Sequence, residues 1–170
     1  YFLKYMIAQS NVNPIQIYII DDVGKTLADF NNVYMYSTKQ ADAIAAFDEI
    51  YDILQKRLIV EREQSLDSEP LILFVINSVE AMNQMTKEVE SQDKFKKLIS
   101  SMENMKICVM ATNVPNTNVM FGAGELIKQL KEIKKYIIFE NIKDIKVYDF
   151  PPAVIREYKK QLDIGDAYYI

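Results

Sequence analysis

The chain has 170 residues, of which 49% are hydrophobic, and its 20 basic and 24 acidic side chains give a net charge of −4. It contains no His, no Trp and a single Cys. These absences exclude a His-dependent nucleophile pair, a structural zinc site and an internal disulfide. The acidic balance disfavours nucleic acid as a partner. The sequence shows no signal peptide and no membrane span.

Apolar runs along the chain predict β-strands. Most of the runs are continuous rather than alternating, which is typical of strands that are buried on both faces of a mostly parallel sheet. The predicted strands are Ile15 to Ile20, Val33 to Tyr36, Leu71 to Ile76, Ile107 to Ala111, Tyr136 to Phe139 and a closing strand at Ala167 to Ile170.

Helical periodicity fills the segments between these strands. A capping box at Ser37 to Gln40 predicts the start of a long helix. Its expected apolar stripe is Ile44, Phe47, Tyr51, Leu54 and Leu58. Further stripes predict helices around Phe95 to Met102, Leu126 to Ile133 and Val154 to Leu162. Alternating strands and helices predict a three-layer α/β fold, in a single domain over residues 1–170.

The first polar residues of interest follow the first strand. Val23-Gly24-Lys25-Thr26 is similar to the end of a phosphate-binding loop, but the first glycine of that motif would fall on Ile19. We therefore expect a plain turn. Asp21 and Asp22 precede it, where α/β proteins place ligand sites and where paired acids can hold Mg²⁺. Solvated acids at a strand end are the simpler interpretation.

The third strand ends in Asn77-Ser78, where its apolar run has the shape of a Walker B segment. A working nucleotidase needs an acid at the first position for the metal, and often a second acid to polarise water. Asn77 has no charge, and Ser78 is a poor base. In a phospho-receiver scheme with Asp21, Asp22 and Thr112, the same Asn77 would stand where the phosphate acceptor is needed.

Thr112 and Asn113 directly follow the fourth predicted strand. They occupy a sensor-like position from which a γ-phosphate could be contacted. Cys108 lies inside that strand, and we expect it to be inert core. We identify no catalytic residue and no metal ligand.

The order of these segments resembles the FtsK/SpoIIIE-type ATPases over nearly all of the chain. Asn13 to Asp21 resembles the strand that follows the P-loop helix, and Gly24, Leu27 and Phe30 resemble the family's Gly–Leu–aromatic segment. Ile107 to Asn113 resembles the segment that usually reads A-T-Q. The resemblance extends to the long helix before Walker B and to the Gly-containing end, Asp163 to Ile170.

The likeness is greatest to the last ATPase domain of an EssC-like coupling protein of type VII secretion. It implies a RecA-like P-loop NTPase fold in a cytoplasmic domain of a cell-membrane protein, with neighbouring ATPase domains in the same chain and hexameric assembly. The implied partners are secreted WXG-type proteins. In related proteins the last domain is implicated in receiving the substrate's C-terminal signal.

The chain departs from the family pattern at its chemical positions. Asn77 and Ser78 replace the Walker B acids, and Asn113 stands where Gln is usual. Tyr1 to Gln9 looks like the helix after a P-loop, so we expect a fragment of a longer chain, with ATP and Mg²⁺ bound only if a P-loop precedes it. We therefore predict a degenerate domain for substrate recognition or regulation of export, with little or no hydrolysis. An active translocase of protein or DNA and a non-enzymatic receiver-like domain remain the alternatives.

Overall fold

The computed structural model describes residues 2–11, 14–61, 65–112, 114, 125–133, 135–146, 148, 150–159, 162–163 and 166–170. The chain forms two compact units, Tyr1–Val114 and Pro115–Ile170, and each is treated by itself. No described helix is both long and apolar enough to cross a membrane. The assignment of residues 1–170 to a single domain stays a prediction.

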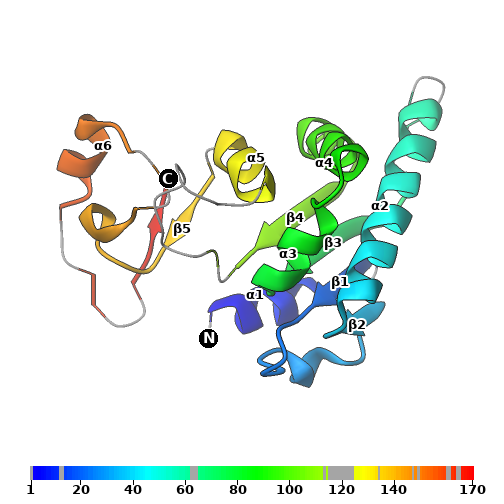
Figure 1. The fold of residues 1–170 in the computed structure, drawn as a ribbon, viewed down its shortest axis with the longest axis horizontal. Coiled ribbons are helices and arrows are strands. Elements are labelled where there is room, and N and C mark those ends of the chain that lie inside the picture. The colour runs from blue at the N-terminus through cyan, green and yellow to red at the C-terminus, as the bar shows by residue number, and fades with distance from the viewer. Residues whose placement is uncertain are drawn as a thin grey trace. The chain divides into compact units, whose positions relative to one another are not determined.

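The first unit is a parallel α/β sheet (Figure 1). Its strands β1 (Ile15–Ile20), β2 (Met35–Ser37), β3 (Leu71–Ile76) and β4 (Ile107–Ala111) are all parallel, in the order β2-β1-β3-β4. The predicted strands at 15–20, 71–76 and 107–111 are confirmed, and the second begins two residues later than predicted. The predicted α/β class with a parallel sheet flanked by helices is therefore confirmed.

Helices lie on both faces of this sheet (Figure 1). Helix α1 (Phe2–Ser10) precedes β1, and a short 3-10 turn, η1 (Ala28–Phe30), separates β1 from β2. Helices α2 (Gln40–Val60), α3 (Val79–Met85) and α4 (Val89–Ser101) follow.

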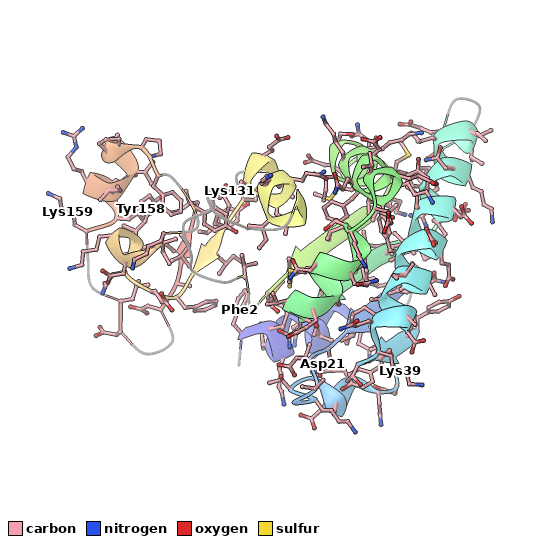
Figure 2. All side chains as sticks on the ribbon, viewed as in Figure 1. Phe2, Asp21, Lys39, Lys131, Tyr158 and Lys159 are labelled. Atoms are coloured by element: carbon pink, nitrogen blue, oxygen red, sulfur yellow. The ribbon has the colours of Figure 1, made fainter. Side chains whose placement is uncertain are left out.

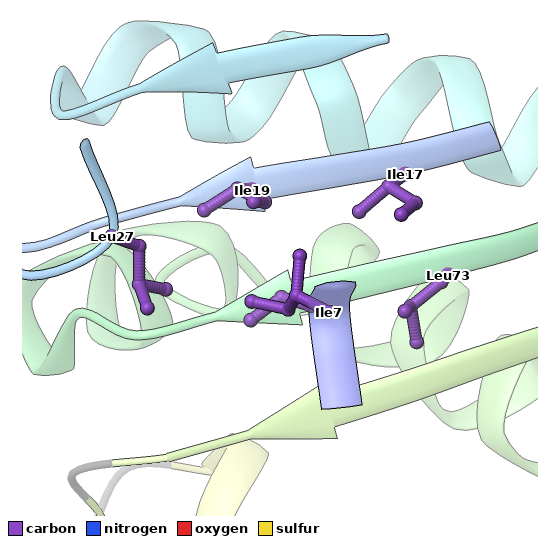
Figure 3. Packing of buried hydrophobic residues seen from close by; sticks show 6 residues of the cluster. Ile7, Ile17, Ile19, Leu27 and Leu73 are labelled. Carbon is purple, nitrogen blue, oxygen red and sulfur yellow. The ribbon is translucent and has the colours of Figure 1, made fainter. Parts of the chain in front are cut away.

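Alternate residues of the central strands point to opposite faces, and each set is buried by different helices. Ile7 of α1 packs against Ile17, Ile19, Leu73 and Val75 on one face (Figure 3). On the other face, the Tyr18 hydroxyl donates to Glu49 of α2 at 3.0 Å. This burial of both faces is the physical reason why β1 and β3 have continuous apolar sequences.

The long helix differs in detail from its predicted stripe. Of the predicted positions Phe47 and Leu54 are buried, and the other buried residues are Ala43, Ala46, Ile50 and Arg57. Small alanines allow close approach to the sheet, and a stripe read from large apolar residues misses them. The predicted capping box is wrong: the helix starts at Gln40, and Ser37 ends β2, where its Oγ accepts from the Lys39 N–H at 3.1 Å.

The edge strand β4 corrects a further expectation. Cys108 is exposed rather than core, and the last three residues of β4 are only half-buried. Within the described part of the chain β4 pairs on one side only, with β3. An apolar run on an edge strand therefore looks, in sequence, like a run on a central one.

The second unit contains α5 (Glu125–Ile133), β5 (Ile137–Ile138), η2 (Ile142–Asp144), α6 (Pro152–Glu157) and β6 (Tyr168–Tyr169). The predicted fifth strand is present but pairs antiparallel with β6 instead of extending the parallel sheet. Aromatic rings of Tyr136, Tyr148 and Phe150 cluster with centroids 4.1–5.9 Å apart. Strand pairing of this kind depends on tertiary contacts that the apolar run does not encode.

Candidate functional site

The carboxyl end of the sheet brings together three of the predicted site residues. In the register, Ile20 lies opposite Ile76, and Ile76 lies opposite Ala111. The three strands therefore end side by side, and the next residues are Asp21, Asn77 and Thr112. Backbone bonds continue the ladder at this edge, from Asn77 N–H to the Ile20 carbonyl at 2.7 Å and from Thr112 N–H to the Ile76 carbonyl at 3.0 Å. Asn113 lies outside the described residues.

Asp21 is the centre of this edge and is 1% exposed (labelled in Figure 2). Its Oδ1 accepts from the Asp22 N–H at 2.9 Å and the Asn77 amide at 2.8 Å. Its Oδ2 accepts from the Leu27 N–H at 2.7 Å and the Tyr36 hydroxyl at 3.0 Å. All four donors are neutral, so a buried carboxylate is stabilised here by hydrogen bonds from four different residues.

Tyr36 shows the electrostatic effect of that carboxylate. Burial, followed by the hydrogen bond to Asp21 and the charges of Asp21 and Asp22, raises the pKa of Tyr36 to about 12. The phenol therefore stays protonated at neutral pH and remains a donor. The sequence did not single out Tyr36, since a tyrosine in a predicted strand has no local signal for this role.

Asn77 joins β1 to β4 through both ends of its amide. Its Nδ2 donates to Asp21, and its Oδ1 accepts from the Thr112 hydroxyl. The side chain is 3% exposed. A carboxylate neighbour requires the NH₂ end and a hydroxyl donor suits the oxygen end, so the two neighbours define which way the amide points. At the position where a nucleotide motor needs an acid, the structure has an amide that is hydrogen-bonded on both sides.

Ser78 has a local role in starting α3. Its hydroxyl oxygen accepts from the Ala81 N–H at 3.2 Å, as an N-cap does, and its hydroxyl lies 3.3 Å from the Glu80 carboxylate. Ser78 is buried, whereas Glu80 is exposed. The serine therefore stabilises the first turn of the helix, a signal that was readable in the sequence as a Ser before an apolar helix.

Asp22 and the Val23–Thr26 segment form a turn. The Lys25 N–H donates to the Asp22 carbonyl at 3.1 Å, and the Thr26 hydroxyl donates to the Asp22 carboxylate at 3.0 Å. Lys25 has φ 54°, and only the three-residue η1 follows. The sequence predicted a plain turn at this segment rather than a phosphate-binding loop, and the turn is confirmed. Asp21 and Asp22 are also separated in role, since Asp21 is buried and Asp22 partly exposed.

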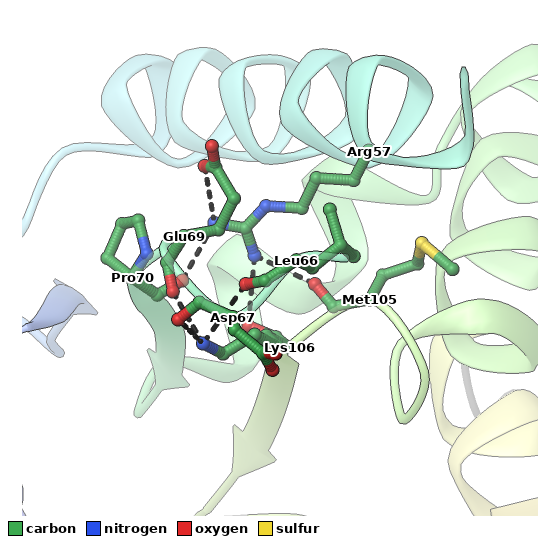
Figure 4. Close-up of polar contacts among 7 residues, drawn as sticks. All are labelled: Arg57, Leu66, Asp67, Glu69, Pro70, Met105 and Lys106. Carbon is green, nitrogen blue, oxygen red and sulfur yellow. Dashed lines mark hydrogen bonds and ion pairs between the residues drawn. The ribbon is translucent and has the colours of Figure 1, made fainter. Parts of the chain in front are cut away.

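A second polar cluster, unexpected from the sequence, lies at the amino end of the sheet (Figure 4). Arg57 from the last turn of α2 is 3% exposed. Its guanidinium donates to the carbonyls of Met105 at 2.7 Å, Lys106 at 3.1 Å and Pro70 at 2.7 Å, and lies 3.7 Å from the Glu69 carboxylate. Burial lowers the pKa of Arg57, and the Glu69 charge opposes that effect.

The chemistry available at the carboxyl end is that of a hydrogen-bonded network across four strands. Among the residues that the structure describes, no group of three or more His, Cys, Asp or Glu side chains is arranged to hold a metal ion. No family model, curated protein or solved structure matches this chain.

Proposed function

We propose that this chain is a degenerate FtsK/SpoIIIE-type ATPase domain of RecA-like fold, which recognises substrates or regulates export and does not itself hydrolyse ATP. The proposed setting is the cytoplasmic part of a membrane-anchored type VII secretion coupling protein. The order of segments along the sequence supports the family, and the parallel α/β sheet is compatible with its fold. The proposed partners are secreted WXG-type proteins and neighbouring ATPase domains in a hexamer.

The single observation that carries the non-hydrolytic half of the proposal is the amide of Asn77. It lies between a buried carboxylate at 2.8 Å and the Thr112 hydroxyl. An amide has no charge with which to hold Mg²⁺, and both of its ends are engaged. A carboxylate at this position would face the Asp21 carboxylate directly, with two like charges in a buried site. The surroundings therefore favour an amide over the acid that a motor requires.

The test compares nucleotide binding and turnover in matched chains. Calorimetric titration with Mg·ATP and a phosphate-release assay are run on the chain and on its Asn77→Ala variant. We expect no turnover that depends on Asn77. Sub-millimolar ATP binding with hydrolysis that disappears in Asn77→Ala would overturn the proposal. Salt-dependent DNA binding would instead support a DNA translocase.

The recognition half needs its own measurement. A fluorescent peptide from the C-terminus of a WXG-type protein is titrated with the chain, and fluorescence anisotropy reports binding. A scrambled peptide of the same composition is the control. Saturable binding of the native peptide alone is expected. Equal binding of both peptides, or of neither, would contradict a role in substrate recognition.

A receiver-like interaction domain is the second candidate, because one specific observation favours it. The order β2-β1-β3-β4 is the order of the first four strands of flavodoxin-like sheets, and Asp21, Asp22 and Thr112 follow its strands. In that scheme the acceptor would be the residue after β3, which is Asn77. Labelling with a small phosphodonor distinguishes the candidates, since an aspartyl phosphate would favour the receiver and we expect none.

A further inference from the structure

The turn that leads into β3 presents backbone carbonyls to one side chain. The Lys106 ammonium donates to the carbonyls of Leu66 at 3.3 Å, Asp67 at 3.2 Å and Glu69 at 2.6 Å (Figure 4). Three carbonyl oxygens from a four-residue segment thus surround one cation. Neutral carbonyls converging on a charge are the arrangement by which proteins hold ammonium groups and monovalent metal ions.

Apart from Lys106, the turn is held by the Glu69 carboxylate, 3.7 Å from the Arg57 guanidinium, and by the Asp67 N–H, which donates to the Ser65 hydroxyl oxygen at 3.1 Å. Of its residues Leu66 is buried, while Asp67, Ser68 and Glu69 are exposed. The Glu69 N–H closes the turn by donating to the Leu66 carbonyl at 2.9 Å, so this oxygen accepts from both Glu69 and Lys106. Without a cation, the partly negative oxygens of these carbonyls would point toward one another, which is electrostatically unfavourable.

Lys106 is held in place for this task from the backbone side. Its φ of 52° lies in the left-handed region, which is unusual for a residue with a side chain. Its own carbonyl accepts from Arg57, and it immediately precedes β4. The residue therefore links the buried guanidinium to the turn, by its carbonyl on one side and its ammonium on the other.

We infer that residues 66–69 form a carbonyl cradle for a monovalent cation, and that Lys106 supplies this cation as a tethered ammonium. The order of the turn then depends on a positive charge at this point. Removing the charge releases the turn, and a small free cation of the same class, NH₄⁺ or K⁺, takes the vacated position. This inference is independent of the proposed function.

The test is amide hydrogen exchange on the full chain in wild type, Lys106→Met and Lys97→Met. Methionine keeps an unbranched side chain, one atom shorter than that of lysine, and, unlike glycine, does not relieve the left-handed backbone. Lys97 is the matched control, because its ammonium donates to the Gln55 side chain at 2.8 Å. We expect the Glu69 amide to exchange about tenfold faster or more in Lys106→Met, and to be unchanged in Lys97→Met. The Thr112 amide at the other end of the sheet is the internal reference.

Rescue distinguishes a cradle from a general loss of contacts. Exchange of the Glu69 amide in Lys106→Met is measured in ammonium, potassium and tetramethylammonium chloride at equal ionic strength. Ammonium or potassium should slow it again, whereas tetramethylammonium is too large to enter and has no N–H. Unchanged exchange in Lys106→Met, or equal exchange in all three salts, would overturn the inference.

A measurement on the unmutated chain covers the case in which Lys106→Met does not fold. In a spectrum of ¹⁵N-labelled lysine side chains, the Lys106 ammonium should be protected from solvent exchange compared with the Lys97 ammonium. Equal exchange of the two ammonium groups would also contradict the cradle.

Discussion

The two ends of the parallel sheet both contain a buried charge, but they satisfy it in opposite ways. At the carboxyl end Asp21 accepts four hydrogen bonds from backbone and side-chain donors on neighbouring segments. At the amino end Arg57 and Lys106 donate almost entirely to backbone carbonyls. The buried acid is therefore surrounded by hydrogen-bond donors, and the two basic side chains are surrounded by hydrogen-bond acceptors.

The two ends also differ in how much of each network is made by side chains. At the carboxyl end the Asp21 carboxylate accepts two hydrogen bonds from side chains, which can be exchanged one at a time, and two from backbone N–H groups. The amino end joins side chains to backbone, which every sequence has, so a substitution there leaves several carbonyls without a donor. We therefore interpret the contacts at the amino end as structural support for the sheet.

The largest expected effect is at the amino end. Arg57→Met keeps an unbranched apolar stem but leaves three carbonyls without their guanidinium donor, and should destabilise the chain by about 3–5 kcal/mol. Urea denaturation followed by circular dichroism measures it. Arg156→Met on α6, where the guanidinium is exposed, is the control and should change stability by less than about 0.5 kcal/mol. If the two substitutions lowered stability equally, the buried Arg57 would not have the supporting role assigned to it at the amino end of the sheet.

Asn77→Asp probes the carboxyl end by adding a second buried acid. Two adjacent carboxylates disfavour joint ionisation, so stability at pH 7 should fall by about 2–4 kcal/mol. The pair binds a proton more tightly in the folded state than in the unfolded state. Its folded pKa is thus raised, and the loss of stability should be small near pH 4 and grow as pH rises.

Denaturation of Asn77→Asp at pH 4 and pH 7 checks this expectation. Asn104→Asp makes the same change of charge at an exposed position and should show little pH dependence. If both variants lose the same stability at both pH values, the Asp21–Asn77 contact does not have the electrostatic role assigned to it.

Thr112→Val tests the last link of the network. The substitution removes the hydroxyl that donates to the Asn77 amide while keeping the shape, and should cost about 1 kcal/mol. The loss should be much smaller when Asn77 is already alanine, and a double-mutant cycle measures this coupling. Fully additive losses would show that Thr112 acts elsewhere.

Tyr36→Phe should lower stability at neutral pH by about 1 kcal/mol, as Thr112→Val does, and should also show a characteristic pH dependence. Its pKa is raised from 10.0 to about 12 in the folded chain. A raised folded pKa gives stability that is complete below pH 10 and lost as pH rises through 12. The difference in stability between wild type and Tyr36→Phe should therefore decrease as the pH rises from 10 to 12. A constant difference from pH 9 to 12 would contradict the Tyr36–Asp21 bond.

Most strands of the parallel sheet could be predicted from the apolar runs alone. Strands at 15–20, 71–76 and 107–111 are as predicted, and for the first two the reason is burial on two faces, which leaves a continuous apolar run. The sequence also located Asp21, Asn77 and Thr112 at strand ends, since a polar residue after an apolar run marks the place where a buried strand ends.

The contacts that those residues make follow from the fold and not from the local sequence. That Asp21 takes four donors, that Arg57 is buried, that β5 pairs with β6 and that Cys108 is exposed all depend on which strands are neighbours and in what register. The physical reason is one of range. Burial of a run is recorded in the local spacing of apolar residues, whereas the side chains of Tyr36 and Asn77, which donate to Asp21, lie 15 and 56 residues away from it along the chain.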